Sequence, residues 1–190
     1  MYKCLANQQF KDQQDYQLVP IRQEDIEKIR LWRNAQRSIL RQQEPLSEQD
    51  QLLYFQEFIW PSFAQAKPKQ ILFSYLSGQE CIGYGGLTHL DWEALRAEVS
   101  FLVNPERIQN AICYRQDFKH YLSLLCQVAF KDLNLHRLFT ETFAYRTEHI
   151  HVLESFGFVR EGVLRDHIYK NGKWSDSIMH GLLTSEASYA

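Results

Sequence analysis

The chain has 190 residues, and its 21 basic and 23 acidic side chains nearly balance, to a formal net charge of -2. Such a balance provides no basic surface for nucleic acid, and no stretch reaches the roughly 20 apolar residues that span a bilayer. We therefore expect neither a nucleic-acid nor a membrane partner. With 45% hydrophobic residues, the composition is typical of one globular domain.

The cysteines follow no paired or zinc-binding spacing, which is typical of reduced thiols in the cytosol, and we expect no metal site. The polar, Gln-rich start of the chain also lacks the apolar core of a secretion signal. We therefore expect a cytoplasmic location. The four cysteines are Cys4, Cys81, Cys113 and Cys126.

Residues 1–15 form an extension of uncertain order, and residues 16–190 form the expected domain. A strand is predicted at residues 16–21. It is followed by a helix at residues 24–34, where apolar side chains recur on one face. The domain therefore begins with a strand and a helix.

A second helix is predicted to begin at Ser47, because acidic residues follow this N-cap in the first turn. Pro61 should end that helix, since proline cannot donate a backbone hydrogen bond. A hairpin of residues 70–76 and 81–89 follows, and the next strand is predicted at residues 95–103.

The longest helix is predicted at residues 117–133, where apolar side chains recur at steps of three and four. A strand at residues 137–144 and a helix at residues 147–156 come next. Gly157 should cap this helix, because a left-handed residue without a Cβ ends a helix at little cost. The Asn171-Gly172 turn then predicts a hairpin. Its strands are residues 158–169 and 175–183.

Three motifs in the last part of the chain, together with the element order β-α-α-β-β-β-α-β-α-β-β, resemble the GNAT superfamily of N-acetyltransferases. The nearest branch acetylates the N-termini of ribosomal proteins or amino sugars. The resemblance implies an α/β (α+β) fold, a single domain with flanking helices and a mixed, mostly antiparallel sheet. The central strands, at residues 95–103 and 137–144, should splay apart. The motifs are Leu135-His136-Arg137-Leu138, Gly157-Phe158-Val159-Arg160-Glu161-Gly162 and Tyr169-Lys170-Asn171-Gly172-Lys173-Trp174.

The resemblance also implies acetyl-CoA as the co-substrate. Its pantetheine would pair with the backbone of the first splayed strand, at Phe101, Leu102 and Val103. Its pyrophosphate would lie on the loop that aligns with residues 113–119. Arg146 takes the place of an Asn that touches the cofactor in relatives. The candidate ligands in the loop are Arg115, Gln116, Phe118 and Lys119.

Glu98 lies on the first splayed strand, where many relatives place an acidic base, and an attacking amine must lose a proton. His149 replaces a small residue near the cofactor and is the candidate for proton transfer. A Trp-Arg-Asn motif resembles one in amino-sugar acetyltransferases, and a histidine on the neighbouring strand could face the same cavity. The expected substrate-binding residues are therefore Trp32, Arg33, Asn34 and His89.

Two departures from the family pattern leave the function open. No glycine occurs between Gly86 and Gly157, although small residues normally let phosphate reach the backbone of this loop. Leu153 replaces the tyrosine that protonates the leaving thiolate in many relatives. The first hypothesis is that the chain transfers acetyl by direct attack to a primary amine of a protein N-terminus, amino sugar or small molecule. A homodimer is the expected assembly. The second hypothesis is a GNAT-fold binding or regulatory protein that has lost catalysis.

Overall fold

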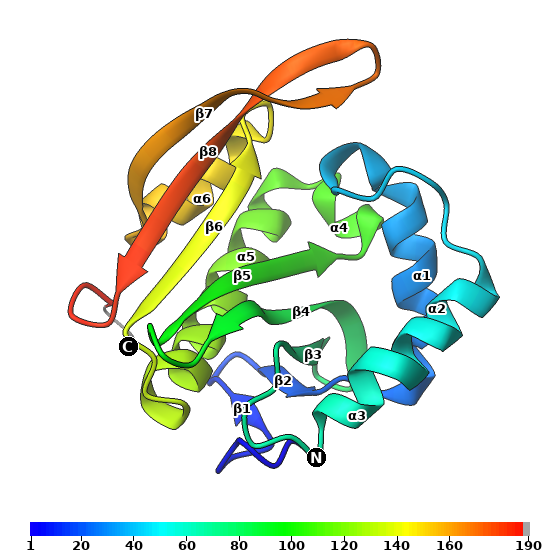
Figure 1. Ribbon diagram of the computed structural model, residues 1–190, viewed down its shortest axis with the longest axis vertical. Helices are drawn as coiled ribbons and strands as arrows, with labels where there is room; N and C mark the ends of the chain where they lie inside the picture. The colour runs from blue at the N-terminus through cyan, green and yellow to red at the C-terminus, as the bar shows by residue number, and fades with distance from the viewer. Residues whose placement is uncertain (188–190) are drawn as a thin grey trace.

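Eight strands form one mixed sheet in the order β1-β2-β3-β4-β5-β6-β8-β7 in the computed structural model, which describes residues 1–187 (Figure 1). Every neighbouring pair is antiparallel except β5 and β6, which are parallel. This confirms the mixed, mostly antiparallel sheet. The strands are β1 (Phe10–Lys11), β2 (Tyr16–Pro20), β3 (Ile71–Ser77), β4 (Glu80–Asp91), β5 (Arg96–Val103), β6 (Arg137–Phe143), β7 (Val159–Lys170) and β8 (Lys173–Leu183).

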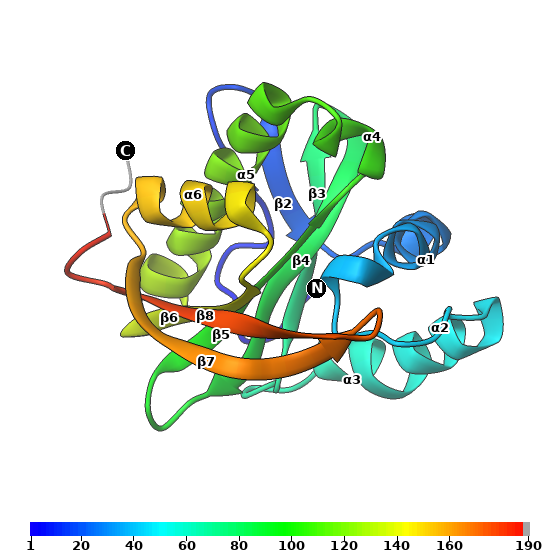
Figure 2. The ribbon, with the colours of Figure 1, turned by 90° about the horizontal axis from the view of Figure 1, so that it is seen from above.

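The helices cover both faces of this sheet. Figure 2 shows α5 and α6 on one side, and α1, α2 and α3 on the other. None of the helices within residues 1–187 is long and apolar enough to cross a membrane. The helices are α1 (Ile26–Ala35), α2 (Glu48–Tyr54), α3 (Trp60–Ser62), α4 (Pro105–Ile108), α5 (Ala111–Cys126) and α6 (Thr147–Phe156), with π-helical turns at Phe55–Ile59 and Gln127–Asp132 and 3-10 turns at Gln23–Asp25 and Arg37–Ile39.

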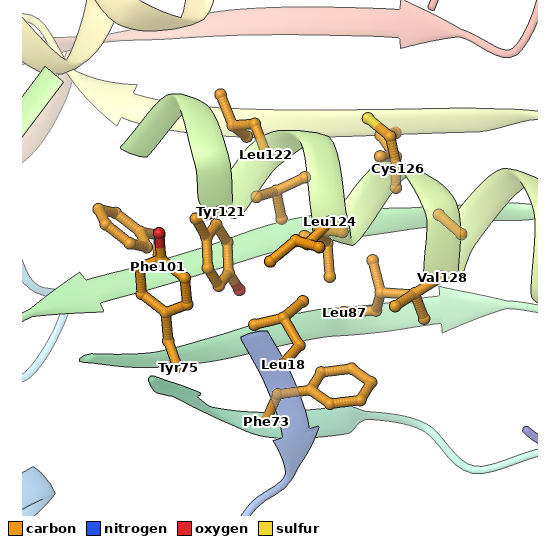
Figure 3. Packing of buried hydrophobic residues seen from close by; sticks show 14 of the residues in the cluster. Leu18, Phe73, Tyr75, Leu87, Phe101, Tyr121, Leu122, Leu124, Cys126 and Val128 are labelled. Atoms are coloured by element: carbon orange, nitrogen blue, oxygen red, sulfur yellow. The ribbon is translucent and has the colours of Figure 1, made fainter. Parts of the chain in front are cut away.

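The alternation of side chains along β3 separates two hydrophobic cores. Phe73 and Tyr75 belong to the larger core, and the Tyr75 ring lies 5.2 Å from that of Tyr121 on α5, as Figure 3 illustrates. Leu72, the neighbour of Phe73 along the strand, points to the opposite face and belongs to the smaller core under α1 and α2, together with Ile29. The sheet is therefore buried on both faces in its centre.

The segment before β2, whose order the sequence leaves open, packs on the domain. Tyr2 is buried, and its hydroxyl accepts a hydrogen bond from the Leu72 amide at 2.8 Å and donates one to the Leu72 carbonyl at 3.1 Å. Phe10 enters the larger core, and β1 pairs with β2. The first strand of the sheet therefore lies within residues 1–15.

Two predicted helix boundaries are wrong. The long helix begins at Ala111 rather than Asp117, because the Asn110 side chain caps it by accepting from the amides of Ile112 and Cys113. Pro61 does not end the second helix at Trp60. A π-helical turn precedes it, and the helical run continues through Pro61 to Ser62.

The expected splay of the central strands is present. β5 and β6 pair only where Arg96, Ala97 and Glu98 meet their partners on β6, and Figure 1 shows them pointing apart beyond that point. A stack of three rings lies beside the opening. The Phe101 and Phe118 ring centroids are 4.4 Å apart, and those of Phe118 and His149 are 4.3 Å apart. The stack joins β5, α5 and α6.

Replacing the middle ring of this stack should destabilise the fold. Phe118 is fully buried, so we expect Phe118→Ala to lower the free energy of unfolding by about 3 to 5 kcal/mol. The matched control is Phe58→Ala, which removes a ring that is 55% exposed and should change the value by about 0.5 kcal/mol or less. Urea denaturation measures both, and equal losses would contradict a stack that supports the splay.

Candidate active site

A cleft of about 1080 Å³ opens where β5 and β6 diverge. Its walls come from β4, β5 and β6, from the first turn of α6 and its N-cap, and from the segment that follows α1. Five of the ionisable side chains that line it come from five separate parts of the chain. They are Arg41, His89, Glu98, Glu141 and His149.

Glu98 is a buried carboxylate of this cleft, at the last position of β5 that pairs with β6. The Arg41 guanidinium donates to both of its oxygens, at 2.7 and 3.3 Å, and His89 Nδ1 lies 2.7 Å from Oε2. His89 reaches it because the register of β4 against β5 shifts there and places His89 at a φ of +48°. The two residues singled out from the sequence are therefore neighbours.

Arg41 also links the two splayed strands. Its Nη2 lies 3.0 Å from an oxygen of Glu141 on β6. The sequence gives no signal for Arg41, because it lies in a polar segment between helices. Glu141 could have been found as the second acidic residue on a splayed strand. Both were missed because their proximity arises only in the folded chain.

Arg41 lies on a strap, defined here as residues 37–46, which crosses the cleft mouth. The Lys170 ammonium, at the tip of the β7–β8 hairpin, donates to the carbonyls of Arg37 and Leu40, and the Tyr145 hydroxyl donates to that of Ser38. The hairpin therefore fixes the strap and holds Arg41 over Glu98.

His149, in the first turn of α6, is buried and lines the inner part of the cleft. Its Nδ1 is 2.7 Å from the Tyr114 hydroxyl and 3.3 Å from Arg146 Nη2. A guanidinium can only donate, so Nδ1 accepts and the ring proton lies on Nε2. Burial, and then the charge of Arg146, holds the pKa of His149 well below its usual range. His149 is therefore a neutral hydrogen-bond donor in the cleft wall.

The residues expected on a pyrophosphate loop lie instead on α5. Arg115 is exposed and pairs with Glu148 at 2.7 Å, and Gln116 and Lys119 are exposed. Phe118 is the central ring of the buried stack. The prediction of a loop at residues 113–119 is therefore wrong, because these residues form part of the helix α5.

Asp117, predicted as the first residue of the long helix, is fully buried inside α5. The Arg107 guanidinium donates to its two oxygens at 2.5 and 2.8 Å, and the Tyr16 hydroxyl donates at 3.0 Å. Asp117 therefore ties α4 and β2 to the long helix and presents no charge to the cleft.

The expected substrate-binding motif on α1 divides between the cleft and its support. Arg33 lines the cleft and donates to the Tyr84 hydroxyl at 2.6 Å. Asn34 holds the strap, accepting from the Leu46 amide and donating to its carbonyl at 2.8 and 2.9 Å. Trp32 packs against the smaller core. The structure thus brings Arg33 and His89 to the cleft, and Trp32 and Asn34 to its scaffold.

The two ends of acetyl-CoA fit this chain unequally. Beyond Glu98, the edge of β5 toward β6 has no strand partner, and Phe101 lines the cleft there. Leu102 and Val103 continue this edge, although the Val103 carbonyl accepts from Gln36 at 2.9 Å. A pantetheine arm can therefore pair with β5, whereas the capped start of α5 offers no matching cradle for a diphosphate. No cluster of metal-ligating side chains occurs among residues 1–187.

Solved structures with the same fold are acetyltransferases, although no curated protein sequence matches the chain. A spermidine N-acetyltransferase from Vibrio cholerae in complex with CoA and spermine has a TM-score of 0.75 and 23% identity, over 90% of this chain and 97% of that one. A dodecameric form of that enzyme, in an intermediate state, has a TM-score of 0.72 and 22% identity, over 90% of this chain and 95% of that one. A putative acetyltransferase has a TM-score of 0.71 and 19% identity, over 95% of this chain and 88% of that one.

A family model described as an acetyltransferase (GNAT) domain matches residues 18–179. The match extends from the second strand almost to the end of the last, so it includes both splayed strands and the cleft between them. Acetyl-CoA is the acyl donor of this family. The chain therefore belongs to the GNAT acetyltransferase family.

Proposed function

We propose that this chain transfers acetyl from acetyl-CoA to a primary amine, with Glu98 as the base. One observation carries the proposal: a buried carboxylate lies at the point where β5 and β6 part, facing the cleft that opens beyond it. An amine reaches the cleft as an ammonium ion and attacks only after losing a proton, which Glu98 can accept. The N–C bond then forms, the C–S bond breaks, and the thiolate takes up a proton.

His149 supports the same reaction as a hydrogen-bond donor. A neutral imidazole does not readily release its Nε2 proton, so His149 acts by stabilising negative charge on the acetyl oxygen or the leaving sulfur rather than by proton transfer. Leu153, at the position of the usual tyrosine, is fully buried in the larger core. The proton of the thiolate therefore comes from Glu98 or from solvent.

The acceptor we propose is a cationic amine. Its ammonium must approach Glu98 where Arg41 now lies, so the carboxylates of Glu98 and Glu141 already form a site shaped for a cation. The likeness to a spermidine N-acetyltransferase makes polyamines the first acceptors to try. Lys67 and Lys69 also line the cleft, which favours testing amines that carry an acidic group, such as amino sugar phosphates and peptides. A homodimer is part of the proposal, supported by the dodecameric relative.

The second candidate is a binding protein without turnover, favoured by the capped start of α5 and the buried Leu153. Calorimetric titration with acetyl-CoA, followed by thiol release with the amine panel, separates the two. Binding with turnover supports the enzyme. Binding without turnover, or no heat at millimolar acetyl-CoA, contradicts the enzyme and supports the second candidate.

Removal of the base should slow the reaction. Glu98→Gln keeps the shape of the side chain, and we expect kcat/KM to fall by about 100-fold or more because general-base catalysis is lost. The control is Glu93→Gln, which changes an exposed residue at the rim of the same cleft. Thiol release at saturating acetyl-CoA measures both, and wild-type turnover in Glu98→Gln would remove this residue from the mechanism.

Removal of the strap guanidinium should help the acceptor to bind. In Arg41→Gln the ammonium of the acceptor no longer competes with a guanidinium for Glu98 and Glu141. KM for the amine should therefore fall by about 3- to 10-fold, which corresponds to an ion pair of about 1 kcal/mol. Arg37→Gln removes a positive charge from the same strap without touching either carboxylate. A higher KM in Arg41→Gln would instead assign Arg41 to acceptor binding.

The neutral state of His149 predicts how stability depends on pH. An unfolded histidine titrates near pH 6.5, whereas the folded pKa of His149 is lowered by burial. Below pH 6.5 the unfolded chain therefore binds more protons, and stability falls as pH falls, by at most about 1.4 kcal/mol per pH unit per histidine. Burial lowers the pKa of His180 too, so it adds to the same slope.

The measurement is the free energy of unfolding in urea between pH 5 and pH 8. We expect a shallower slope in His149→Gln, which removes one of the two buried histidines. His151→Gln, at an exposed position of the same helix, is the control and should keep the wild-type slope. The same slope in all three proteins would mean that His149 is not held neutral.

A further inference from the structure

The first turns of α5 and α6 form the surface that the distal end of a bound thioester would meet. The two helices follow β5 and β6, the one parallel pair among residues 1–187. Ligands of parallel strands bind beyond their carboxyl ends. The helix starts lie side by side there, with Tyr114 against His149 and Arg115 against Glu148.

The backbone at the start of α5 is already engaged, whereas Arg146, the N-cap of α6, makes no capping hydrogen bond through its side chain. The Asn110 side chain accepts from the amides of Ile112 and Cys113 at 3.0 and 3.1 Å, and the Tyr114 amide donates to the Asn110 carbonyl at 2.9 Å. A diphosphate needs several free amides that converge without covering side chains. Every residue between Gly86 and Gly157 carries a side chain. The start of α5 therefore provides no such cradle.

The positive charges of the surface are also engaged. Arg107 is bound to the buried Asp117, and Arg115 to Glu148. Arg146 donates to His149, and burial lowers its pKa. Two carboxylates thus accompany the arginines, which reduces the attraction for a nucleotide with several phosphate charges.

The inner part of the cleft, by contrast, contains buried hydroxyl groups without a hydrogen-bond partner in the described part of the chain. Thr140 and Thr142 on β6 both line it, and they are 3% and 1% exposed. Neither hydroxyl has a hydrogen-bond partner within residues 1–187. Across the opening, the edge of β5 lacks a strand partner. Both walls therefore offer polar groups to a chain of amides, which is the chemistry of pantetheine.

We infer that this chain recognises its acyl donor through the acyl-pantetheine arm and not through the nucleotide. Acyl-pantetheine thioesters without adenosine are then donors of the same reaction: the amine nitrogen bonds to the acyl carbon, the C–S bond breaks, and the pantetheine thiol leaves with a proton. The inference rests on the proposed function for its reaction, and on the two surfaces above for its selectivity.

Calorimetry on the full chain tests the selectivity directly, with acetyl-CoA, S-acetylpantetheine and adenosine 3′,5′-bisphosphate as probes. We expect the Kd of S-acetylpantetheine to lie within about tenfold of that of acetyl-CoA, and no competition by millimolar adenosine bisphosphate. Conventional nucleotide recognition predicts the opposite pattern. A Kd more than about 100-fold weaker, or displacement of acetyl-CoA by the bisphosphate, would overturn the inference.

Matched variants assign the selectivity to residues. Thr142→Val preserves the side-chain shape and should weaken acetyl-CoA and S-acetylpantetheine equally, by about fivefold, because one hydrogen bond to the arm is lost. Arg115→Gln and Lys119→Gln, on the exposed side of α5, should leave both affinities unchanged. Selective weakening of acetyl-CoA in either of these two variants would show that the nucleotide is held there.

The failure of this inference can be distinguished from the failure of the proposed function. If both thioesters bind as expected but no amine of the panel is acetylated, the reaction is wrong and the selectivity stands. If acetyl-CoA supports turnover while S-acetylpantetheine neither binds nor reacts, the selectivity alone is wrong. If neither thioester binds, both are wrong.

Discussion

The separation of β5 and β6 after their short paired stretch is the constraint on which the site depends. Parallel strands normally continue to share hydrogen bonds along their length. Here the rings of Phe101, Phe118 and His149 stack beside the opening and join a strand to two helices. The same stack places His149 in the wall of the cleft. One packing interaction therefore supports both the opening and one of its polar groups.

The buried carboxylate of Glu98 imposes a second constraint, because a buried charge without a partner is strongly unfavourable. Arg41 supplies that partner from the strap, and Lys170 holds the strap in place. The charge of Glu98 in the cleft is thus neutralised by the chain itself. An acceptor that brings its own positive charge can replace Arg41 without leaving Glu98 unpaired, which connects this ion pair to the expected preference for amines.

At the other end of the cleft, the early start of α5 changes what the fold can bind. The helix gains its first turn from the Asn110 cap, and the buried pair of Asp117 and Arg107 fixes the next turn against β2 and α4. The start of α5 is therefore stabilised by the same amides and positive charge that an anion would need for binding. Among residues 1–187, the unpaired buried polar atoms include the hydroxyls of Thr140 and Thr142, which line the cleft.

The sequence by itself determined the order of the elements and those boundaries that depend on near neighbours. The helix Thr147–Phe156 and its left-handed cap at Gly157, with a φ of +118°, follow from local periodicity and backbone freedom. The family resemblance placed Glu98 beside the splay. The periodicity of apolar side chains put the start of the long helix at Asp117, six residues after its actual start at Ala111. Only the tertiary structure decided that Asp117 is a buried ion-pair partner and that Arg41 meets Glu98 and Glu141, 57 and 100 positions away. Such contacts depend on distance in the folded chain, which local sequence patterns do not encode.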